Sequence, residues 1–124
     1  MAGLTLDAGA LIAYERGAFE IRRILKIAFG RGVTPTIPAV VLAEVWRGDR
    51  KDARVAWLLQ ACNVEPLDEQ RARAAGVLRR STAGAGTVDA CVAVGVRERG
   101  DVIATSDPGD MRRLVGTGIT ILQV

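Results

Sequence analysis

The stretch Val-Ile-Ala-Thr-Ser-Asp-Pro, residues 102–108, decides the fold class of this chain, because it reads as a buried strand ending at an acid that begins a helix. The same order occurs near the amino terminus, where Leu-Thr-Leu at 4–6 leads into Asp7 and a helical apolar period over 8–16. Short apolar strands that alternate with helices predict a parallel sheet with crossover helices. We therefore expect an α/β fold.

The rest of the chain continues this alternation. Helices are expected over residues 18–29, 38–48, 49–59, 68–80, 87–99 and from 107 onward, and strands at 33–37, around Val64 and at 119–124. Asp49, Asp68 and Thr87 are the expected helix caps, and residues 81–86 read as a Gly/Ala/Ser linker. With 124 residues, the chain is expected to form one domain over 1–124.

The amino-acid composition excludes several classes of catalytic and metal-binding site. The sequence contains no histidine, which excludes Ser-His-Asp and Cys-His catalysis and every metal site that needs imidazole. Cys62 and Cys91 have no metal-binding or redox spacing, so we expect buried, reduced thiols. No secretory signal pattern and no apolar run long enough for a membrane span is present, which predicts a cytoplasmic protein without membrane contact.

Four acids stand at the edges of apolar segments. Asp7 and Asp107 follow strands, Glu44 lies in the apolar segment 38–46, and Asp89 lies at the start of another at 87–94. In a doubly wound sheet the carboxyl ends of neighbouring strands form the ligand site, so Asp7 and Asp107 should converge. A carboxylate in apolar surroundings is costly unless it is paired or binds a metal. Carboxylates without histidine or thiolate favour Mg²⁺ or Mn²⁺.

The acids also have ordinary structural explanations. Asp7 and Asp107 are of the type that caps helices, and Asp89 would complement the dipole of the helix that Thr87 begins. However, all the acids stand at the edges of apolar segments, and this shared position favours one common site over a separate explanation for each acid.

Two acids have an arginine three residues further on, with which each could form an ion pair. Glu44 has Arg47 three residues on, at the spacing of a helical ion pair. Asp110 is a fifth candidate for the site, and it is equally well placed to pair with Arg113.

Four segments in order resemble the successive motifs of PIN-domain ribonucleases: residues 4–13, 37–45, 87–90 and 102–110. More narrowly, the short chain resembles a VapC-type toxin of a toxin–antitoxin pair. The resemblance implies a three-layer α/β/α fold with a five-stranded parallel sheet. It also implies an endoribonuclease that depends on Mg²⁺ or Mn²⁺, in which metal-activated water hydrolyses RNA phosphodiester bonds. The catalytic and metal-binding acids it implies are Asp7, Glu44, Asp89 and Asp107.

The resemblance also concerns residues beside these four acids, some of which differ among members of the family. Asp110 matches a position that is sometimes acidic, and the hydroxyl of Thr105 or Ser106 would help to hold the metal shell. The family often has Ser or Thr two residues after its first Asp, whereas this chain has Gly9. The departure removes a hydroxyl that could position water.

The resemblance further implies a VapB-like antitoxin and a homodimer. Such an antitoxin lays a helical segment in a groove of the toxin and pushes a basic side chain into the acidic site. Tyr14 and Trp46 are candidates for lining the groove, whereas Phe19 and Trp57 are expected in the core.

A net charge of +3 permits a polyanionic partner without requiring one. RNA phosphates are expected to contact the basic clusters beside the acids, which run from Arg47 to Arg54 (Arg47, Arg50, Lys51 and Arg54) and include Arg112 and Arg113. The clusters at 22–26 and 71–80 are expected to be mostly solvated. Aromatic residues make up only 4%, so recognition should depend on shape and backbone more than on stacking.

Two other functions fit parts of this pattern. A catalytically silent PIN-like module would bind RNA or a partner without cleaving it, and Gly9 is the feature that supports it. A phospho-acceptor receiver domain would need an Asp after the third strand and a late Lys. Here Pro66 and Leu67 follow that strand, and no lysine follows Lys51, so the receiver function is disfavoured.

Overall fold

The computed structural model describes residues 2–124 and contains a five-stranded sheet in the order β3-β2-β1-β4-β5. The strands are β1 (Leu4–Leu6), β2 (Thr36–Pro38), β3 (Asn63–Glu65), β4 (Val102–Thr105) and β5 (Ile121–Gln123). Each pair of neighbouring strands is parallel. The expected α/β class with a five-stranded parallel sheet is therefore confirmed.

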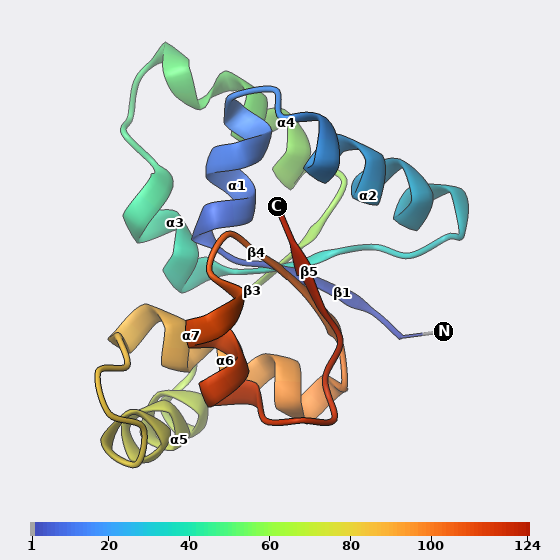
Figure 1. Ribbon diagram of the computed structural model, residues 1–124. Helices are drawn as coiled ribbons and strands as arrows, with labels where there is room; N and C mark the ends of the chain where they lie inside the picture. Colours follow the sequence, from blue (N-terminus) through green and yellow to red (C-terminus); the bar gives the residue numbers. More distant parts are fainter. Residues whose placement is uncertain (1) are drawn as a thin grey trace.

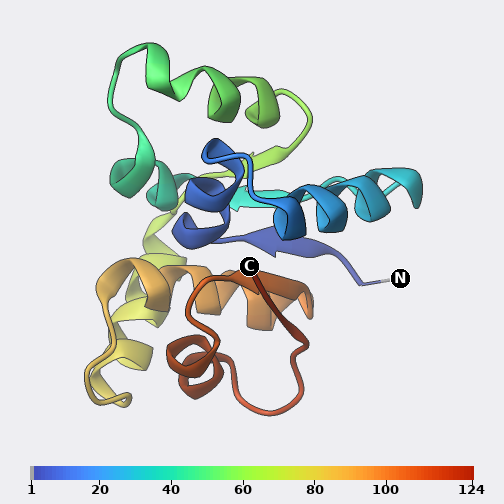
Figure 2. The ribbon, with the colours of Figure 1, turned by 45° about the horizontal axis from the view of Figure 1, so that its top comes forward.

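Helices cover both faces of this sheet. They are α1 (Ala8–Glu15), α2 (Phe19–Gly30), α3 (Ala39–Val45), the 3₁₀ turn η1 (Arg50–Asp52), α4 (Ala53–Leu59), α5 (Glu69–Arg80), α6 (Thr87–Arg99) and α7 (Pro108–Val115). Figure 1 shows α1 to α4 above the sheet and α5 to α7 below it. The same two groups stay separated by the sheet in Figure 2, which confirms the three layers.

The core lies on both sides of the central strands. Every residue of β1 is buried, and Ile37 of β2 and Ile103 of β4 are fully buried beside it. In α6 the whole run from Ala90 to Val96 is buried, because the helix is enclosed by the sheet, α5 and α7. That enclosure explains why this helix is apolar on all sides. Within residues 2–124, no helix combines the length and apolarity needed to cross a membrane.

The loop before α4 corrects two of the expected helix bounds. The helix expected over 38–48 ends at Val45, and Trp46 is already extended. The reason is Asp52, whose buried carboxylate accepts hydrogen bonds from the backbone amides of Arg47, Gly48 and Asp49. These amides are therefore satisfied by a side chain instead of a longer helix. Asp49 caps η1, which leads into α4.

Other bounds differ by a few residues. The strand expected over 33–37 is formed only by Thr36–Pro38, and the last strand is Ile121–Gln123 instead of 119–124. Thr87 is the first helical residue of α6 and not its cap, since Gly86 occupies the cap position without a side-chain hydrogen bond.

Phe19 and Trp57 were expected in the core, and this expectation is wrong. Their exposed fractions are 76% and 73%. In α2 the buried face contains Ile21, Ile24, Leu25 and Ala28, and in α4 it contains Val55 and Leu58. At 100° per residue, Phe19 lies about 200° from Ile21, and Trp57 lies about 200° from Val55. Both rings therefore project away from the core.

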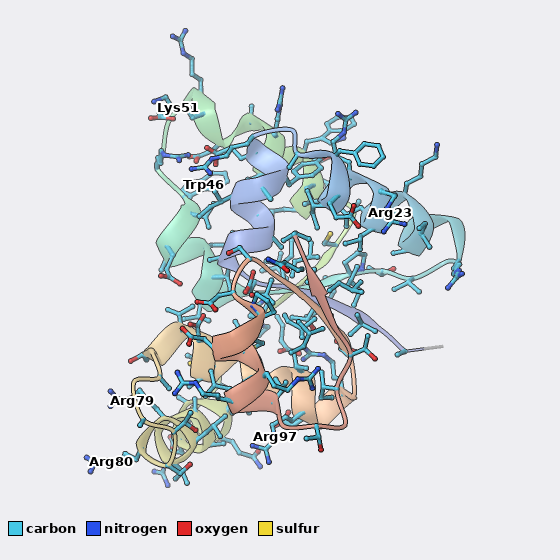
Figure 3. All side chains as sticks on the ribbon, in the orientation of Figure 1. Arg23, Trp46, Lys51, Arg79, Arg80 and Arg97 are labelled. Carbon is cyan, nitrogen blue, oxygen red and sulfur yellow. The ribbon has the colours of Figure 1, made fainter. Side chains whose placement is uncertain are left out.

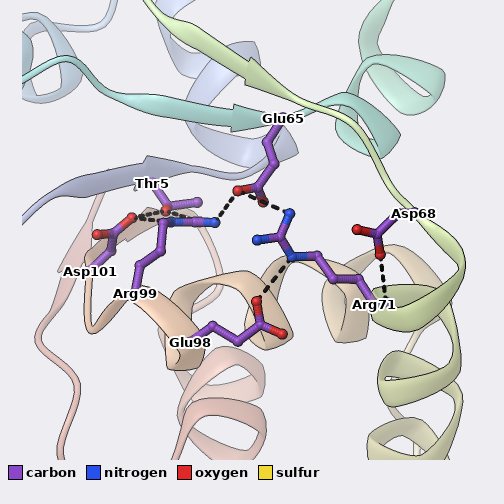
Figure 4. Close-up of polar contacts among 7 residues, drawn as sticks. All are labelled: Thr5, Glu65, Asp68, Arg71, Glu98, Arg99 and Asp101. Atoms are coloured by element: carbon purple, nitrogen blue, oxygen red, sulfur yellow. Dashed lines mark hydrogen bonds and ion pairs between the residues drawn. The ribbon is translucent and has the colours of Figure 1, made fainter.

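A network of ion pairs ties α6 to the sheet (Figure 4). Arg99 donates to Asp101 over 2.8 Å, to Glu65 over 2.5 Å and to the Thr5 hydroxyl over 2.9 Å. The Thr5 hydroxyl in turn donates to Asp101 over 2.7 Å. One guanidinium thus connects the end of α6 with β1, β3 and the residue before β4.

Candidate active site

The carboxyl edge of the sheet collects the ends of several elements. In Figure 1 the starts of α1, α6 and α7 and the chain around α3 gather on the left, where the strands end. Because β1 pairs with β4, with Leu6 opposite Ala104, the residue after β1 lies beside the end of β4. The Asp7 amide donates to the Ala104 carbonyl oxygen over 3.3 Å. This pairing brings residues about 100 positions apart in sequence to one site.

Asp7 is the most deeply placed acid of this edge, with 5% of its surface exposed. Its Oδ1 accepts a hydrogen bond from the Ala10 amide over 2.9 Å and caps α1. Burial raises the pKa of Asp7, while hydrogen bonding to the Thr105 side chain and the amides of Ala10 and Gly9 offsets part of this effect; the charge of Glu44 raises the pKa further. The capping explanation is therefore correct for Asp7, and the carboxylate is also electrostatically strained.

Asp89 lies half-buried in the first turn of α6 and is influenced by the other acids. Burial is the largest cause that raises its pKa. Repulsion by the charges of Asp7, Glu44, Asp110 and Asp107 raises it further. The four other predicted acids therefore lie close enough to Asp89 for their charges to act on it, at the same edge of the sheet.

Glu44 reaches this edge from the exposed side of α3. It was expected on a buried helix face, and that expectation is wrong, because Val41 and Val45 fill the buried face and Glu44 is exposed. It does not pair with Arg47, whose guanidinium lies 2.7 Å from Glu15. The charge of Glu44 nevertheless raises the pKa of both Asp7 and Asp89.

Asp107 and Asp110 flank the first turn of α7 and are both exposed. Oδ1 of Asp107 accepts from the Asp110 amide over 3.2 Å, so Asp107 caps the helix as its sequence context suggested. The Asp107 amide donates to Oγ1 of Thr105 over 3.0 Å, which fixes the turn after β4. Asp110 forms the alternative ion pair with Arg113, over 3.1 Å.

Gly9 and Ser106 occupy the same small space beside Asp7. A Cβ atom at position 9 would lie 2.0 Å from Oγ of Ser106, 2.7 Å from its Cβ and 3.0 Å from its backbone nitrogen. Only glycine therefore allows α1 to pass so close to the turn after β4. The Ser106 hydroxyl stands where a side chain at position 9 would otherwise begin.

The donor set at this edge consists of carboxylate and hydroxyl oxygens, which suits a hard divalent cation. Among residues 2–124, no three acidic or thiol side chains already form a group that could enclose a metal ion. Mg²⁺ commonly keeps several waters and binds through one or two carboxylates, so a closed cage is not required. Burial, and after it the neighbouring negative charges, raise the pKa of Asp7 and Asp89, and a bound cation would oppose both effects.

The basic residues expected to contact RNA differ in their surroundings. Arg112 donates to the carbonyl oxygens of Gly116 and Ile119, and Arg113 donates to Ala83, so both hold the loops around α7. Arg50 and Lys51 are exposed and lie in η1, and Figure 3 labels Lys51 at the upper left of the molecule.

Sequence reasoning did not show that three arginines share a cleft, although two of them, Arg22 and Arg54, belong to predicted basic clusters. Arg16, Arg22 and Arg54 line a common cleft with Tyr14 and Gly17. They come from the end of α1, from α2 and from α4, so no cluster in the sequence joins all three. Only the packing of α1 against α2 and α4 brings them together.

Comparison with known proteins supports the same architecture. Residues 4–116 match the family described as PIN domain. No curated protein sequence matches the chain. Among solved structures, VapBC2 from Rickettsia felis bound to a promoter DNA fragment is similar with a TM-score of 0.77 and 13% identity, covering 98% of each chain.

Two further solved structures share this architecture. DNA-bound VapBC from Salmonella typhimurium is similar with a TM-score of 0.76 and 22% identity, over 99% of this chain and 98% of that one. FitAcB from Neisseria gonorrhoeae has a TM-score of 0.65 and 17% identity, over 97% of this chain and 96% of that one. At these identities the likeness establishes the fold.

Proposed function

This chain belongs to the PIN domain family, which it matches over residues 4–116, and we propose that it is a metal-dependent endoribonuclease. The observation that carries the proposal is the grouping of five acids at the carboxyl edge of the sheet, where burial, and after it the charges of the four other acids, raise the pKa of Asp89. A protein gains nothing in stability from such repulsion unless a cation neutralises it. A site for a hard cation and a polyanionic substrate explains why these acids share one edge.

Each acid has a defined task in this proposal. Asp7 and Asp89 would bind Mg²⁺ or Mn²⁺, with Glu44 and Asp107 completing the ligands directly or through water. Asp7 is positioned for this by β1 and by the Ala10 amide, which fixes one of its oxygens. A cation held there would polarise the scissile phosphate and lower the pKa of a bound water, which would give up a proton to solvent and form a P–O bond as the bond to the ribose oxygen breaks.

Hydroxyl groups and a further acid would orient this arrangement. Thr105 contacts Asp7 from the end of β4 and accepts from the Asp107 amide, so it links two of the acids. Ser106 lies against Gly9 and offers the hydroxyl that the family often places two residues after its first acid. Asp110 would act in the site only when it leaves Arg113.

RNA would be held by cations outside the acidic edge. Arg50 and Lys51 are the exposed members of the predicted set, whereas Arg47, Arg112 and Arg113 would contact phosphate with donors left over from their protein partners. We assign them this role as a proposal, with Arg50 and Lys51 contributing most.

We further propose that the chain is the toxin of a VapBC-like pair, with a VapB-like antitoxin as its partner. The support is the fold likeness to chains of VapBC and FitAcB along nearly their whole length. An antitoxin side chain with a positive charge would find the uncompensated acids a favourable site. The homodimer implied by the resemblance stays a prediction.

Cleavage of RNA tests the proposal directly. The purified chain should cut single-stranded RNA with Mn²⁺ or Mg²⁺ present and stop when EDTA is added. Asp89→Asn should abolish cutting, whereas Glu20→Gln, an exposed acid on α2, should leave it unchanged. If no metal and no enzyme concentration produces cleavage, the silent RNA- or partner-binding module becomes the better description.

A further inference from the structure

A second group of charged side chains lies where the end of α1 and the starts of α2 and α4 meet, at the top of Figure 1. Tyr14, Arg16, Gly17, Arg22 and Arg54 line a cleft of about 450 Å³ there, which we call the Arg54 cleft. We propose that the Arg54 cleft binds the phosphate backbone of single-stranded RNA. This inference rests on the ribonuclease function proposed above and adds a binding site for the substrate outside the acidic edge.

The charges of the Arg54 cleft are available to a ligand. Arg16, Arg22 and Arg54 are exposed, and within residues 2–124 none of them forms an ion pair. Arg54 donates one hydrogen bond to the Glu15 carbonyl oxygen over 3.0 Å, which steadies its guanidinium without neutralising it. Guanidinium groups bind phosphate through paired N–H donors, so this cleft matches a polyphosphate chain.

The Arg54 cleft is continuous with the predicted RNA-contacting residues. Arg54 also lines a neighbouring recess together with Glu15, Arg50 and Lys51. Glu15 does not cancel these charges, because Arg47 already pairs with it over 2.7 Å. The cations thus form a strip from α2 to η1, which suits an extended polyanion better than a single small anion.

Exposed aromatic rings accompany the arginines of the cleft. Phe19 precedes Arg22 by one helical turn on α2, and Trp57 follows Arg54 by one turn on α4. Residues three apart share a helix face, so each of these two arginines has an exposed ring beside it. Single-stranded RNA uses such a combination, since bases stack on the rings while cations hold the phosphates.

The cleft also stays open and lies within reach of the acids. Gly17 has a φ of +74°, and a Cβ there would lie 3.0 Å from Nη1 of Arg54, so glycine both makes the turn and keeps space for the guanidinium. The eight residues of α1 separate the cleft from Asp7, which corresponds to about 12 Å of helix. An RNA strand that occupies both places would extend along α1.

A binding experiment without cleavage tests the inference. Fluorescence anisotropy with a labelled single-stranded oligoribonucleotide in EDTA compares the parent with Arg16→Gln/Arg22→Gln/Arg54→Gln. The triple variant should bind at least about 10-fold more weakly, and the slope of log affinity against log salt should fall by about 2, as expected for three lost phosphate contacts. Phe19→Ala/Trp57→Ala should also weaken binding by about 10-fold.

A matched control removes the same charge elsewhere. Arg73→Gln/Arg79→Gln/Arg80→Gln takes three exposed arginines from α5, where Arg79 and Arg80 lie at the opposite end of the molecule in Figure 3. It should change RNA affinity by less than twofold. The double variant Arg16→Gln/Arg22→Gln keeps the hydrogen bond from Arg54 to Glu15, so any loss of RNA affinity in it does not come from breaking that bond. Circular dichroism checks that each variant is folded.

The outcomes separate this inference from the proposed function. If the cleft variant and the α5 variant bind RNA equally well, the Arg54 cleft is not an RNA site. The same conclusion follows if the cleft variant keeps full RNA affinity but loses a protein partner. If the parent never cleaves RNA with metal and the cleft variant still loses binding, the ribonuclease proposal fails while the binding site stands.

Discussion

At the scale of single residues, Asp7 combines a structural and a chemical task. Its carboxylate caps α1 through the Ala10 amide, and burial together with the charge of Glu44 raises its pKa. In solvent this negative charge would cost little, whereas at 5% exposure it is largely removed from water. The same side chain therefore stabilises a helix and introduces an electrostatic cost, which a cation would remove.

Asp7→Asn should separate these two tasks. Asparagine caps helices about as well as aspartate, so the cap is retained while the charge is lost. RNA cleavage should fall by about 100-fold or more, a loss typical of removing one charge-stabilising group. At neutral pH the metal-free variant should unfold at higher denaturant concentration than the parent.

The pH dependence of this difference follows from the direction of the pKa shift. Because the pKa of Asp7 is raised above its ordinary value of 3.8, the folded protein holds the proton more tightly than the unfolded chain. The parent therefore loses stability as pH rises from 3.8 through the raised pKa, and the advantage of Asp7→Asn should disappear below pH 3.8. Urea unfolding in EDTA between pH 3 and 7 measures this. An advantage that is the same at every pH would contradict the assignment.

Gly9 offers a second test at residue scale. Alanine normally stabilises a helix relative to glycine, and Gly76→Ala in the exposed part of α5 should gain about 0.5–1 kcal/mol. Gly9→Ala should instead lose about 1–3 kcal/mol, because its Cβ would overlap Ser106. Adding Ser106→Gly should recover part of the loss. Equal stabilisation by both alanine substitutions would contradict this, because it would mean that the turn after β4 can move to make room for a Cβ atom at position 9.

At the scale of elements, α6 is held at its two ends by different forces. Its start carries Asp89 at the carboxyl edge, and its end carries Arg99, whose guanidinium binds Asp101, Glu65 and Thr5. Between these ends the helix is buried on all sides. The position of Asp89 in the site therefore depends on how firmly the network beneath the sheet fixes the whole helix.

Arg99→Met should loosen this helix. Methionine keeps the apolar stem but leaves Asp101, which is 5% exposed, without its cation, and the expected loss is about 2–3 kcal/mol. Arg73→Met breaks an exposed pair with Glu69 and should cost less than about 1 kcal/mol. Thermal unfolding of both variants gives the comparison. Similar losses in the two would mean that the network contributes no more than a surface ion pair.

Most elements and the converging acids could be predicted from the sequence, because apolar period and strand-end acids are local signals. The alternation placed Asp7 and Asp107 at neighbouring strands, as the β1–β4 pairing confirms. The loop around Asp52 could not be foreseen, since three backbone amides in it bond to the carboxylate of one side chain a few residues further on, and the apolar period does not show this. The exposure of Phe19 and Trp57 could not be predicted from hydrophobicity, because hydrophobicity favours burial of large apolar side chains although such residues do occur on surfaces.

At the scale of the whole molecule, charge is separated in space although the net value is only +3. The acids gather at the carboxyl edge, while exposed arginines line the Arg54 cleft and the outer face of α5. The two groups of arginines lie at opposite ends of the molecule (Figure 1), so only the Arg54 cleft would guide a polyanion along α1 toward the acids, where a divalent cation would bind. Net charge therefore says less about partners than the arrangement does.

Metal binding should be visible in the stability of the whole chain. The core is complete without a metal, so EDTA should leave the fold intact and only lower its stability. A cation that binds the folded state alone stabilises it by about 2.7 kcal/mol at 100 times its Kd, so Mn²⁺ should raise the Tm of the parent. The increase should be lost in Asp89→Asn and retained in Glu20→Gln, where the carboxylate that is replaced lies on α2 and pairs with Arg23.

The increase in Tm should also depend on pH. Because Mn²⁺ relieves the repulsion that contributes to the raised pKa of Asp89, the increase should shrink as pH falls and the acids take up protons. An equal increase in all three proteins, or one that does not change with pH, would mean that the cation binds elsewhere and that the acids at the carboxyl edge do not form its site.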